Sequence, residues 1–350
     1  MRNWRDLVVD SFATVREALS RIDSGTAQLA LVLDDQGSFV GIITDGDVRR
    51  GLLKGITLDD PLSLVMNPRP ITGVVGRTRE DGLGLMRAKG VRHLPILDTD
   101  GRLVGLQITD ELSNSDTFDN PVVLMAGGLG TRLRPLTNHL PKPMLPIGGR
   151  PILEHLVNSL SSQGFRRIYI SVRYLAEIVE EHFGDGARFG VEIDYLKEDE
   201  TLGTAGALSL LPADTSKPII VINGDLITDI NISQMLDFHT GQGAYATMAV
   251  SSHQYQVPYG VVQTSGARVS SVVEKPLVSW FVNAGAYVLE PQILQRVEAE
   301  TYLDMPDLLN AVIQAGFPIS AFPLREAWRD IGRLLDLQLA NRELDGPEVD

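Results

Sequence analysis

Residues 124–150 read LMAGGLGTRLRPLTNHLPKPMLPIGGR, and they begin within a short apolar run, residues 122–125, that predicts a buried strand. The strand opens into glycines at positions 127, 128 and 130, which let backbone N–H groups approach a polyanion because they carry no Cβ atom. Arginine and lysine side chains follow at positions 132, 134, 142 and 150, and such side chains neutralise phosphate charge. The stretch therefore predicts a strand followed by a loop that binds a nucleoside triphosphate.

Two well-known phosphate loops do not fit this stretch. The P-loop ends in Gly-Lys-Ser/Thr, which is absent here, and the dinucleotide-binding loop has a third glycine where this chain has Leu133. An ordinary glycine-rich surface loop is the plain alternative. It is disfavoured because glycines, an arginine and the tripeptide PKP at 141–143 fall in one window after a strand.

The order of the elements after the loop indicates the fold. Helical periodicity at 152–163 and 175–183 alternates with apolar strands at 167–172, 192–196 and 218–223. Alternation of this kind predicts an α/β fold, a Rossmann-like domain with a mainly parallel sheet and helices on both faces. Ligands of such sheets lie beyond the carboxyl ends of the strands, where the glycine loop and Asp225 both fall.

The motif resembles that of an enzyme family. GGLGTRLRPLT followed by PKP is similar to the sugar-1-phosphate nucleotidylyltransferases, and the resemblance extends over about residues 121–341. It implies transfer of a nucleoside monophosphate, GMP from GTP as the first choice, to a sugar 1-phosphate, with Mg²⁺ as cofactor. The same fold with UTP, dTTP or CTP, or with a non-sugar phosphate acceptor, stays open as an alternative. A nucleotide-sensing regulatory protein without activity is the rival from another class.

Two carboxylates are candidate metal ligands. Asp225 ends the strand PIIVINGD, and Mg²⁺ prefers carboxylate oxygens, whereas a turn-capping aspartate is the alternative. The resemblance adds Asp330, because WRDIG at 328–332 is similar to a family segment whose aspartate shares the metal.

The resemblance also implies which residues contact the nucleotide. The segment EDETLGTAGAL at 198–208 would contact the nucleobase, and its LGTAG form is most similar to the guanylyl-transferring members, such as the mannose-1-phosphate guanylyltransferases. The sugar stays open among mannose, glucosamine, glucose and a heptose. Helix N–H groups in this segment are also suited to meet a phosphate. The predicted nucleotide-binding residues are Gly127, Gly128, Gly130, Thr131, Arg132, Glu200, Gly203 and Thr204.

Three further segments face the sugar by resemblance. They are the pair Tyr259-Gly260, EKP at 274–276 and NAG at 283–285, which supply a carboxylate, a lysine and an amide. Each of them is also compatible with a simple turn. The predicted sugar-binding residues are Gly260, Glu274, Lys275, Asn283 and Gly285.

The predicted reaction is in-line attack by a sugar-1-phosphate oxygen on the α-phosphorus of the triphosphate. This nucleophile is already an anion, so no general base is needed, and the sequence shows no obvious Ser/His/Asp or Cys/His set. The barrier is then mainly charge repulsion and positioning. The implied catalytic residues are Arg132 for the triphosphate tail, Lys142 for the α-phosphate, Asp225 for the metal and Lys275 for the attacking phosphate.

The first third of the chain is a repeat. ALVLDDQGSFVGIITDGDV from Ala30 and LPILDTDGRLVGLQITDEL from Leu94 align without a gap at an offset of 64 residues. Each copy predicts two strands joined by a tight turn, with a glycine at the position that needs positive φ. The pair resembles tandem CBS domains, small α+β modules that often bind adenosine nucleotides and regulate attached enzymes. The predicted domains are residues 1–58, 59–116 and 117–350, with a polar linker at 114–120.

Only the first copy keeps the residues that hold a ribose in the CBS family. Thr44 and Asp47 match them, whereas Ile108 and Glu111 stand at these positions in the second copy. The resemblance implies at most one adenine-nucleotide site, and a pair that only packs or dimerises is the alternative, because Thr44 is also a suitable helix N-cap. CBS pairs commonly associate, so we expect a homodimer.

Composition limits the partners. Residues 1–116 carry 14 basic and 17 acidic side chains, and residues 117–350 carry 17 basic and 28 acidic ones, which is unsuited to binding nucleic acid. The chain has no cysteine, which excludes a disulfide scaffold and a thiol nucleophile. No apolar run reaches the ~18 residues of a membrane span, and the start MRNWRDLVVD lacks a signal-peptide pattern. We therefore expect a cytoplasmic protein with no membrane partner.

Overall fold

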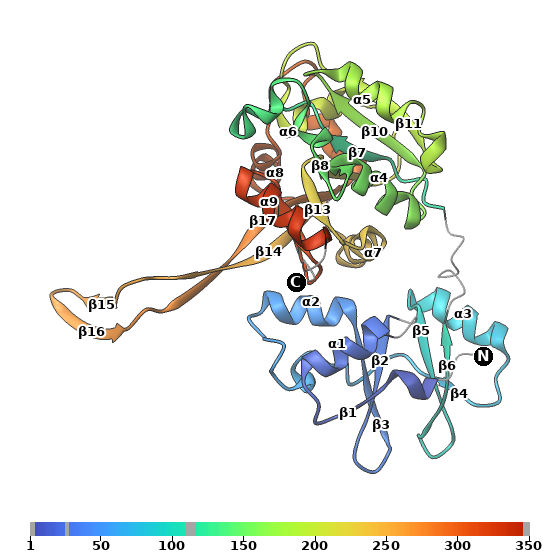
Figure 1. Cartoon of the computed structure of the whole chain (residues 1–350). Helices are drawn as coiled ribbons and strands as arrows, with labels where there is room; N and C mark the ends of the chain where they lie inside the picture. The colour runs from blue at the N-terminus through green and yellow to red at the C-terminus, as the bar shows by residue number, and fades with distance from the viewer. Residues whose placement is uncertain (1–3, 25–27, 109–116, 346–350) are drawn as a thin grey trace. The chain divides into compact units, whose positions relative to one another are not determined.

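The computed structural model describes residues 4–24, 28–108 and 117–345 of the chain. Contacts between residues divide the chain into two compact units, Met1–Asp116 and Thr117–Asp350, and Figure 1 labels many of their helices and strands. The linker predicted at 114–120 lies partly outside the described residues. Each unit has its own buried core.

The first unit holds two three-stranded sheets of the same build. In each sheet the middle strand pairs in parallel with a short strand and antiparallel with the third strand. The strands are β1 Val8–Asp10, β2 Leu29–Leu33, β3 Phe39–Thr44, β4 Gly73–Val74, β5 His93–Leu97 and β6 Leu103–Ile108. The helices are α1 Val15–Ser24, α2 Asp45–Leu53 and α3 Arg79–Lys89, with 3-10 helices η1 Trp4–Leu7 and η2 Leu62–Leu64.

The two sheets confirm the repeat. The bounds of β2 and β3 map onto those of β5 and β6 at the offset of 64 residues that the sequence gives, and both strand pairs bulge at the same place. The turn glycines Gly37 and Gly101 have φ of 77° and 78°, the left-handed conformation that the sequence predicts. Leu29 and Leu31 share a buried cluster with Leu103, so the two sheets pack against each other.

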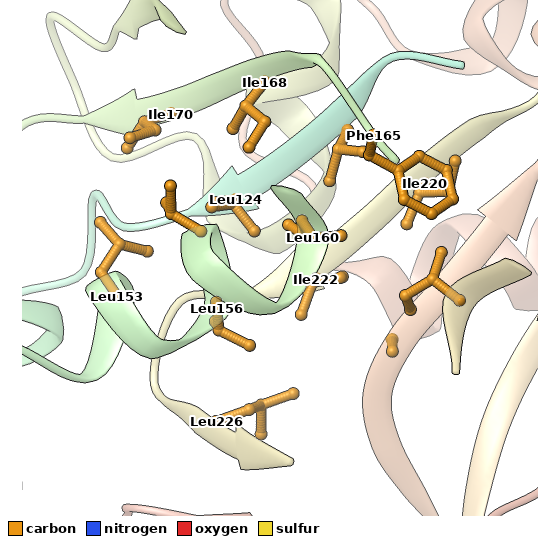
Figure 2. Close-up of a cluster of buried hydrophobic side chains, with 14 of the residues drawn as sticks. Leu124, Leu153, Leu156, Leu160, Phe165, Ile168, Ile170, Ile220, Ile222 and Leu226 are labelled. Carbon is orange, nitrogen blue, oxygen red and sulfur yellow. The ribbon is translucent and has the colours of Figure 1, made fainter. Parts of the chain in front are cut away.

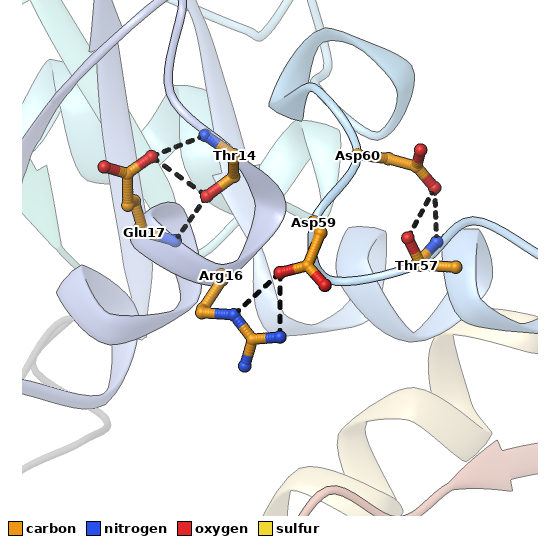
Figure 3. Close-up of polar contacts among 6 residues, drawn as sticks. All are labelled: Thr14, Arg16, Glu17, Thr57, Asp59 and Asp60. Carbon is orange, nitrogen blue, oxygen red and sulfur yellow. Dashed lines mark hydrogen bonds and ion pairs between the residues drawn. The ribbon is translucent and has the colours of Figure 1, made fainter.

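Side-chain hydrogen bonds fix where local elements of this unit begin (Figure 3). The N–H and hydroxyl of Thr14 donate to Glu17 Oε2 at 2.7 and 2.9 Å, which caps the start of α1. Thr57 makes the same pattern with the carboxylate three residues further on. Arg16 donates two hydrogen bonds to Asp59 and so joins α1 to the loop after α2.

The second unit is built on a seven-stranded sheet of order β11-β10-β7-β12-β17-β14-β18. Among these described strands only β17 runs antiparallel to its neighbours, which confirms the predicted α/β fold with a mainly parallel sheet. The strands are β7 Val122–Met125, β10 Arg167–Val172, β11 Glu192–Lys197, β12 Ile219–Asn223, β14 Ala246–Gln256, β17 Leu277–Leu289 and β18 Ile319–Pro323.

Apolar side chains cover both faces of this sheet. Along β7, Val122 and Leu124 belong to one buried cluster and Val123 to the other, because successive side chains of a strand point to opposite faces. Figure 2 shows the first cluster, where leucines of α4 pack against the strands. The helices are α4 Ile152–Ser162, α5 Ala176–Phe183, α6 Gly203–Gly206, α7 Ile232–Gln242, α8 Met305–Gln314 and α9 Leu334–Asp345.

Short elements complete the second unit. The two-stranded pieces are β8 Pro146–Ile147 with β9 Arg150–Pro151, β13 Leu226–Thr228 with β19 Trp328–Asp330, and β15 Val261–Ser265 with β16 Arg268–Val273. The 3-10 helices are η4 Thr131–Leu133, η5 Leu136–Asn138, η6 Lys142–Met144, η7 Ala187–Phe189, η8 Ala207–Leu210 and η9 Pro291–Arg296. Among the described residues, no helix has the length and apolar character needed to cross a membrane.

Strands β14 and β17 continue past the sheet as a two-stranded extension, residues 251–282, which we call the β arm. Strand β14 pairs with β18 as far as Val250, and β17 pairs with β12 from Ala286 onward, so beyond these positions the two strands pair only with each other. Strands β15 and β16 form the far end of the arm, and Figure 1 shows it projecting away from the body of its unit. The sequence did not predict this arm.

Candidate active site

The glycine loop follows β7 and folds back on itself. Gly130 has φ of 59°, and a Cβ atom there would lie 2.9 Å from the Cβ of Lys142, so glycine is required by conformation and by space. The hydroxyl of Thr137 donates to the Gly130 carbonyl at 2.9 Å and closes the turn. Thr131 and Arg132 then begin η4. Nothing lies within 4 Å of a Cβ atom built on Gly128, so the loop backbone is open at that position.

A buried carboxylate holds the start of the loop in place. A Cβ atom on Gly127 would lie 2.5 Å from Glu198 Oε1, and Glu198 is 9% exposed. The hydroxyl of Ser171 donates to Oε1, and the N–H of Leu202 donates to Oε2 at 3.0 Å. Because both oxygens are engaged, Glu198 connects the glycine loop to the turn before α6, although the sequence analysis did not single it out.

Lys142, Asp225 and Asp330 come together beside the loop. Lys142 Nζ pairs with Asp225 Oδ2 and lies 3.8 Å from Asp330 Oδ1. Two short strands bring the carboxylates together, since Leu226 of β13 is opposite Asp330 of β19. The N–H of Gly224 donates to the Met125 carbonyl at 2.9 Å, which places Asp225 against the end of β7. Predicted residues from three separate parts of the sequence therefore form one cluster.

One carboxyl group of the cluster, that of Asp330, has a raised pKa. Burial raises the pKa of Asp330 above its ordinary value of 3.8, and the nearby Asp225 carboxylate raises it further, while Lys142 and Arg132 oppose the shift. Two carboxylates in close proximity repel each other, and Lys142 offsets only part of this repulsion, because the pKa of Asp330 is raised in its presence. Ionising Asp330 therefore costs more free energy here than ionising a carboxyl group that is fully exposed to water.

The cluster opens into a cavity of about 310 Å³. Gly128, Thr131 and Arg132 of the loop line it together with Lys142 and Asp225. Among the described residues that line the cavity, the cations are therefore Arg132 and Lys142, and both face the same space as the open loop backbone. The cavity has the chemistry of a site for a phosphate chain.

The donor set fits a hard divalent cation. Asp225 and Asp330 supply carboxylate oxygens, the repulsion between them would be relieved by a cation, and magnesium in nucleotide enzymes is held by one or two carboxylates plus substrate phosphates. Among the described residues, no group of three or more His, Cys, Asp or Glu side chains could enclose a metal. The geometry therefore suits a metal that arrives with phosphate ligands.

Close packing and hydrogen bonds to residues 303–305 hold the predicted nucleobase segment in place. Gly203 has φ of 77°, and a Cβ there would lie 2.6 Å from the Leu303 carbonyl. The N–H and hydroxyl of Thr204 donate to Asp304 Oδ1 at 3.1 and 3.2 Å, and the hydroxyl accepts from the N–H of Met305 at 2.8 Å. Thr204 thus ties α6 to the start of α8, and its neighbour Thr201 lines the cavity. Glu200 is exposed.

The structure divides the predicted sugar-binding residues into two groups. Asn283 and Gly285 lie in the sheet, where Asn283 Nδ2 donates to the hydroxyl of Tyr287 at 2.7 Å and Oδ1 accepts from the N–H of Gly285 at 3.0 Å. Gly260, Glu274 and Lys275 are on the β arm. There a Cβ on Gly260 would lie 2.9 Å from Glu274 Oε2, and the N–H of Lys275 donates to the Tyr259 carbonyl at 3.3 Å.

In the first unit, Thr44 and Asp47 bind each other. Thr44 is the N-cap of α2, its hydroxyl donates to Asp47 Oδ2 at 2.6 Å, and its N–H donates to the same oxygen at 2.9 Å. Arg50 pairs with the other oxygen at 2.6 Å. In the second copy Ile108 ends β6, and Glu111 lies outside the described residues. The helix-capping alternative therefore describes what Thr44 does in this structure.

Both parts of the chain match families of known proteins. Residues 121–345 match the family model described as nucleotidyl transferase, and residues 3–54 and 62–106 match the model described as CBS domain. The β catalytic subunit of mannose-1-phosphate guanylyltransferase from Danio rerio is 36% identical over 222 residues, which are 61% of this chain and 61% of that protein. A UTP–glucose-1-phosphate uridylyltransferase from Synechocystis is 32% identical over 247 residues, which are 65% and 64% of the two chains.

A solved structure shows the same resemblance. HddC from Yersinia pseudotuberculosis superimposes with a TM-score of 0.51 at 27% identity, over 64% of this chain and 99% of that one. A second HddC structure, complexed with GMP-PN, has a TM-score of 0.50 over the same shares of the two chains. The matched region spans just under two thirds of the length of the curated relatives above.

Proposed function

Because the chain belongs to the nucleotidyl transferase family, we propose that it transfers a nucleoside monophosphate from a nucleoside triphosphate to a sugar 1-phosphate and releases pyrophosphate. One observation carries this proposal: Lys142 pairs with Asp225 and lies near Asp330, and Lys142 and Asp225 line a cavity with the glycine loop and Arg132. The arrangement combines phosphate-binding cations with a carboxylate pair, and the described cavity wall contains no histidine or cysteine suited to covalent catalysis.

The bond changes of the proposed step balance without a proton transfer. A phosphate oxygen of the sugar 1-phosphate forms a bond to the α-phosphorus, and the bond from that phosphorus to the bridging oxygen breaks. Pyrophosphate leaves with the electron pair. Backbone N–H groups of the loop and the Arg132 guanidinium would hold the β- and γ-phosphates, and Lys142 would offset the charge that develops on the α-phosphate.

We assign the metal role to the carboxylate pair. Asp225 and Asp330 would hold Mg²⁺, whose charge would make the α-phosphate a better electrophile. Lys142 already lies between the two carboxylates, so it would keep them in position in the free protein. This role for the lysine follows from its burial, because its side chain is only 10% exposed.

The donor base is proposed to be guanine. The L-G-T-A-G segment, the guanylyltransferase relative and the solved relative complexed with GMP-PN all favour it. The uridylyltransferase relative keeps UTP as the alternative donor.

The test is a pyrophosphate-release screen of GTP, UTP, dTTP, CTP and ATP against a panel of sugar 1-phosphates, with phosphocholine as a non-sugar acceptor. Release should require both substrates and Mg²⁺, and GTP should be the fastest donor. The Asp225→Asn variant should lose ~10²–10³-fold in turnover. Equal turnover of that variant and the wild type would remove Asp225 from the mechanism. Release with phosphocholine alone would reassign the acceptor.

For the first unit we propose one adenine-nucleotide site beside Thr44 and Asp47, because matched CBS domains and the T-x-x-D pattern coincide there. Calorimetry with AMP and the full chain tests it, since AMP is not a donor for the transfer. Asp47→Asn should abolish the binding heat. The matched control is Asp81→Asn, because Asp81 makes the same kind of helix-capping contact, with Thr78 at the start of α3, at a position that does not correspond to the proposed site. Wild-type protein that shows no heat with AMP would refute the site.

A further inference from the structure

The β arm is exposed to solvent, although it has the few charged and many apolar residues that are typical of buried strands. Of its 32 residues only Arg268, Glu274 and Lys275 are charged at neutral pH, whereas charged residues make up 22% of the whole chain. Ten of its large apolar side chains are exposed, among them Tyr255, which is 52% exposed, and Trp280, which is 55% exposed. No residue of the arm, all of which the structure describes, is buried.

The exposed apolar side chains of the arm indicate that another surface binds to it. An isolated two-stranded hairpin is marginally stable in water, and contiguous exposed apolar surface in proteins of this kind marks an interaction site. Both faces of the arm carry large apolar side chains, for example Trp280 on one face and Phe281 on the other. A partner that covers the arm must therefore contact both faces.

The residues on the arm indicate what the partner is. Gly260, Glu274 and Lys275 lie together on the arm, and these are residues that the family resemblance assigns to the sugar and its phosphate. The described residues that line the catalytic cavity include none from the arm. The cavity of one chain therefore provides Arg132 and Lys142 for two highly charged substrates, and Lys142 is already paired with Asp225. It lacks the cation that the attacking phosphate needs.

The arm does not reach its own cavity. The β14–β17 ladder continues unbroken from Ser251↔Val282 to Gln256↔Leu277, and it carries the arm away from the body of its unit (Figure 1). Folding the arm back would break this ladder. The arm carries a net charge of +1, since it holds Arg268, Lys275 and Glu274, and the whole chain carries −14, so the arm is opposite in net charge to a second copy.

By the rim of the cavity we mean three exposed apolar residues, one that lines the cavity and two that closely follow a lining residue in the sequence. Leu129 lines the cavity and is 40% exposed, and Leu334 and Leu335, which follow the lining residue Gly332, are 52% and 62% exposed. These side chains are uncovered within one chain, as the arm is. Two copies related by a two-fold axis would cover both surfaces at once, because each arm would reach the other copy's rim.

We propose that the β arm docks on the catalytic unit of a second copy of this chain and places Lys275 and Glu274 in that copy's active site. This inference rests on the proposed transferase function for the role of Lys275, whereas the docking of the arm does not depend on it. Each active site of the dimer is then composite: one chain supplies the glycine loop, Lys142 and the two aspartates, and the other supplies the sugar-phosphate contacts.

Mixed dimers test the proposal. Lys275→Ala damages only the arm and Asp225→Asn only the cavity, so each homodimer should be at least ~10²-fold less active than the wild type. Chains with two different tags are co-expressed and the doubly tagged dimer is purified. If the arm acts on the other copy, this mixed dimer has one intact site out of two and about half the wild-type turnover. If the arm acts on its own chain, both sites are damaged and the mixed dimer is as inactive as either homodimer, which would overturn the proposal.

A second readout needs no activity. The chain has no cysteine, so Tyr259→Cys on the arm and Leu129→Cys on the rim can be made in separately tagged chains without background. A short bismaleimide should link the two tagged chains in the mixed dimer. A control pair with Tyr259→Cys and Thr240→Cys, which lies on a helix outside the rim, should not be linked.

Wild-type protein that light scattering shows to be a monomer would overturn the proposal, and its sedimentation with phosphatidylcholine vesicles would assign the arm to a membrane surface. Absence of transferase activity in the wild type, with the cross-link present, would refute the function and leave the arm contact standing.

Discussion

Replacing Lys142 by methionine probes the centre of the proposed site. Its side chain is 10% exposed, and its ammonium lies between Asp225, whose side chain is 25% exposed, and Asp330, whose side chain is 47% exposed. Methionine keeps an unbranched stem of similar length and removes the charge. The Asp225 carboxylate then loses its cation partner, and the two carboxylates repel each other without compensation.

Two magnitudes follow from this geometry. Loss of one charge-stabilising contact in a transition state costs ~3–4 kcal/mol, so turnover should fall by ~10²–10³-fold. The carboxylates are partly solvated, so the stability loss should stay at about 1–3 kcal/mol, below that of a fully buried pair. For a unit of this size, each 1 kcal/mol lowers Tm by about 2–4 °C.

The assay is initial-rate pyrophosphate release at saturating Mg²⁺ and substrates, with a thermal melt on the same sample. The matched control is Lys217→Met, which removes an ion pair between Lys217 and Asp119 at 2.7 Å whose side chains are 50% and 76% exposed. A pair so exposed contributes about 0–1 kcal/mol, so the control should keep normal turnover. If Lys142→Met retained turnover within about threefold of the wild type, the assignment of Lys142 to the α-phosphate would be refuted.

Two further predictions concern the loop and the carboxylates. Gly127→Ala should lower Tm, because its Cβ would lie 2.5 Å from an oxygen of the buried Glu198, whereas Gly128→Ala should not, because nothing lies within 4 Å of its Cβ position; equal melting temperatures would contradict the packing argument. Asp330→Asn should raise Tm at pH 7 in EDTA, since a raised pKa in the folded state means that the free energy of unfolding falls as pH rises through that pKa. The gain should vanish below about pH 3.8, where the wild-type carboxyl is protonated in both states, and a variant less stable than wild type at pH 7 would contradict this sign.

The strands near the glycine loop could be predicted closely from sequence. The expected bounds 122–125 and 167–172 coincide with β7 and β10, because both strands are buried on two faces and are therefore rich in apolar residues between polar turns. The repeat could be predicted for a related reason. Two copies of one pattern at a fixed offset specify the same sheet twice, including the positive φ of Gly37 and Gly101.

The contribution of individual side chains was harder to predict. Among the three acids of 198–200, composition does not distinguish the buried Glu198 from the exposed Glu200, since only the position of the chain after β11 decides which one faces the loop. The β arm was missed because its apolar residues match an ordinary sheet strand equally well. Whether such a strand is covered by its own chain is a property of tertiary structure, and the sequence pattern does not contain it.

The most direct test of the central claim is a ³¹P NMR spectrum of the wild-type protein with GTP, Mg²⁺ and a panel of hexose and heptose 1-phosphates. Nucleotidyl transfer predicts pyrophosphate and a nucleoside-diphosphate sugar in equal amounts, only when both substrates are present. Phosphate and a nucleoside diphosphate as products, or no change with GTP and none when UTP, dTTP, CTP and ATP replace it in turn, would contradict it.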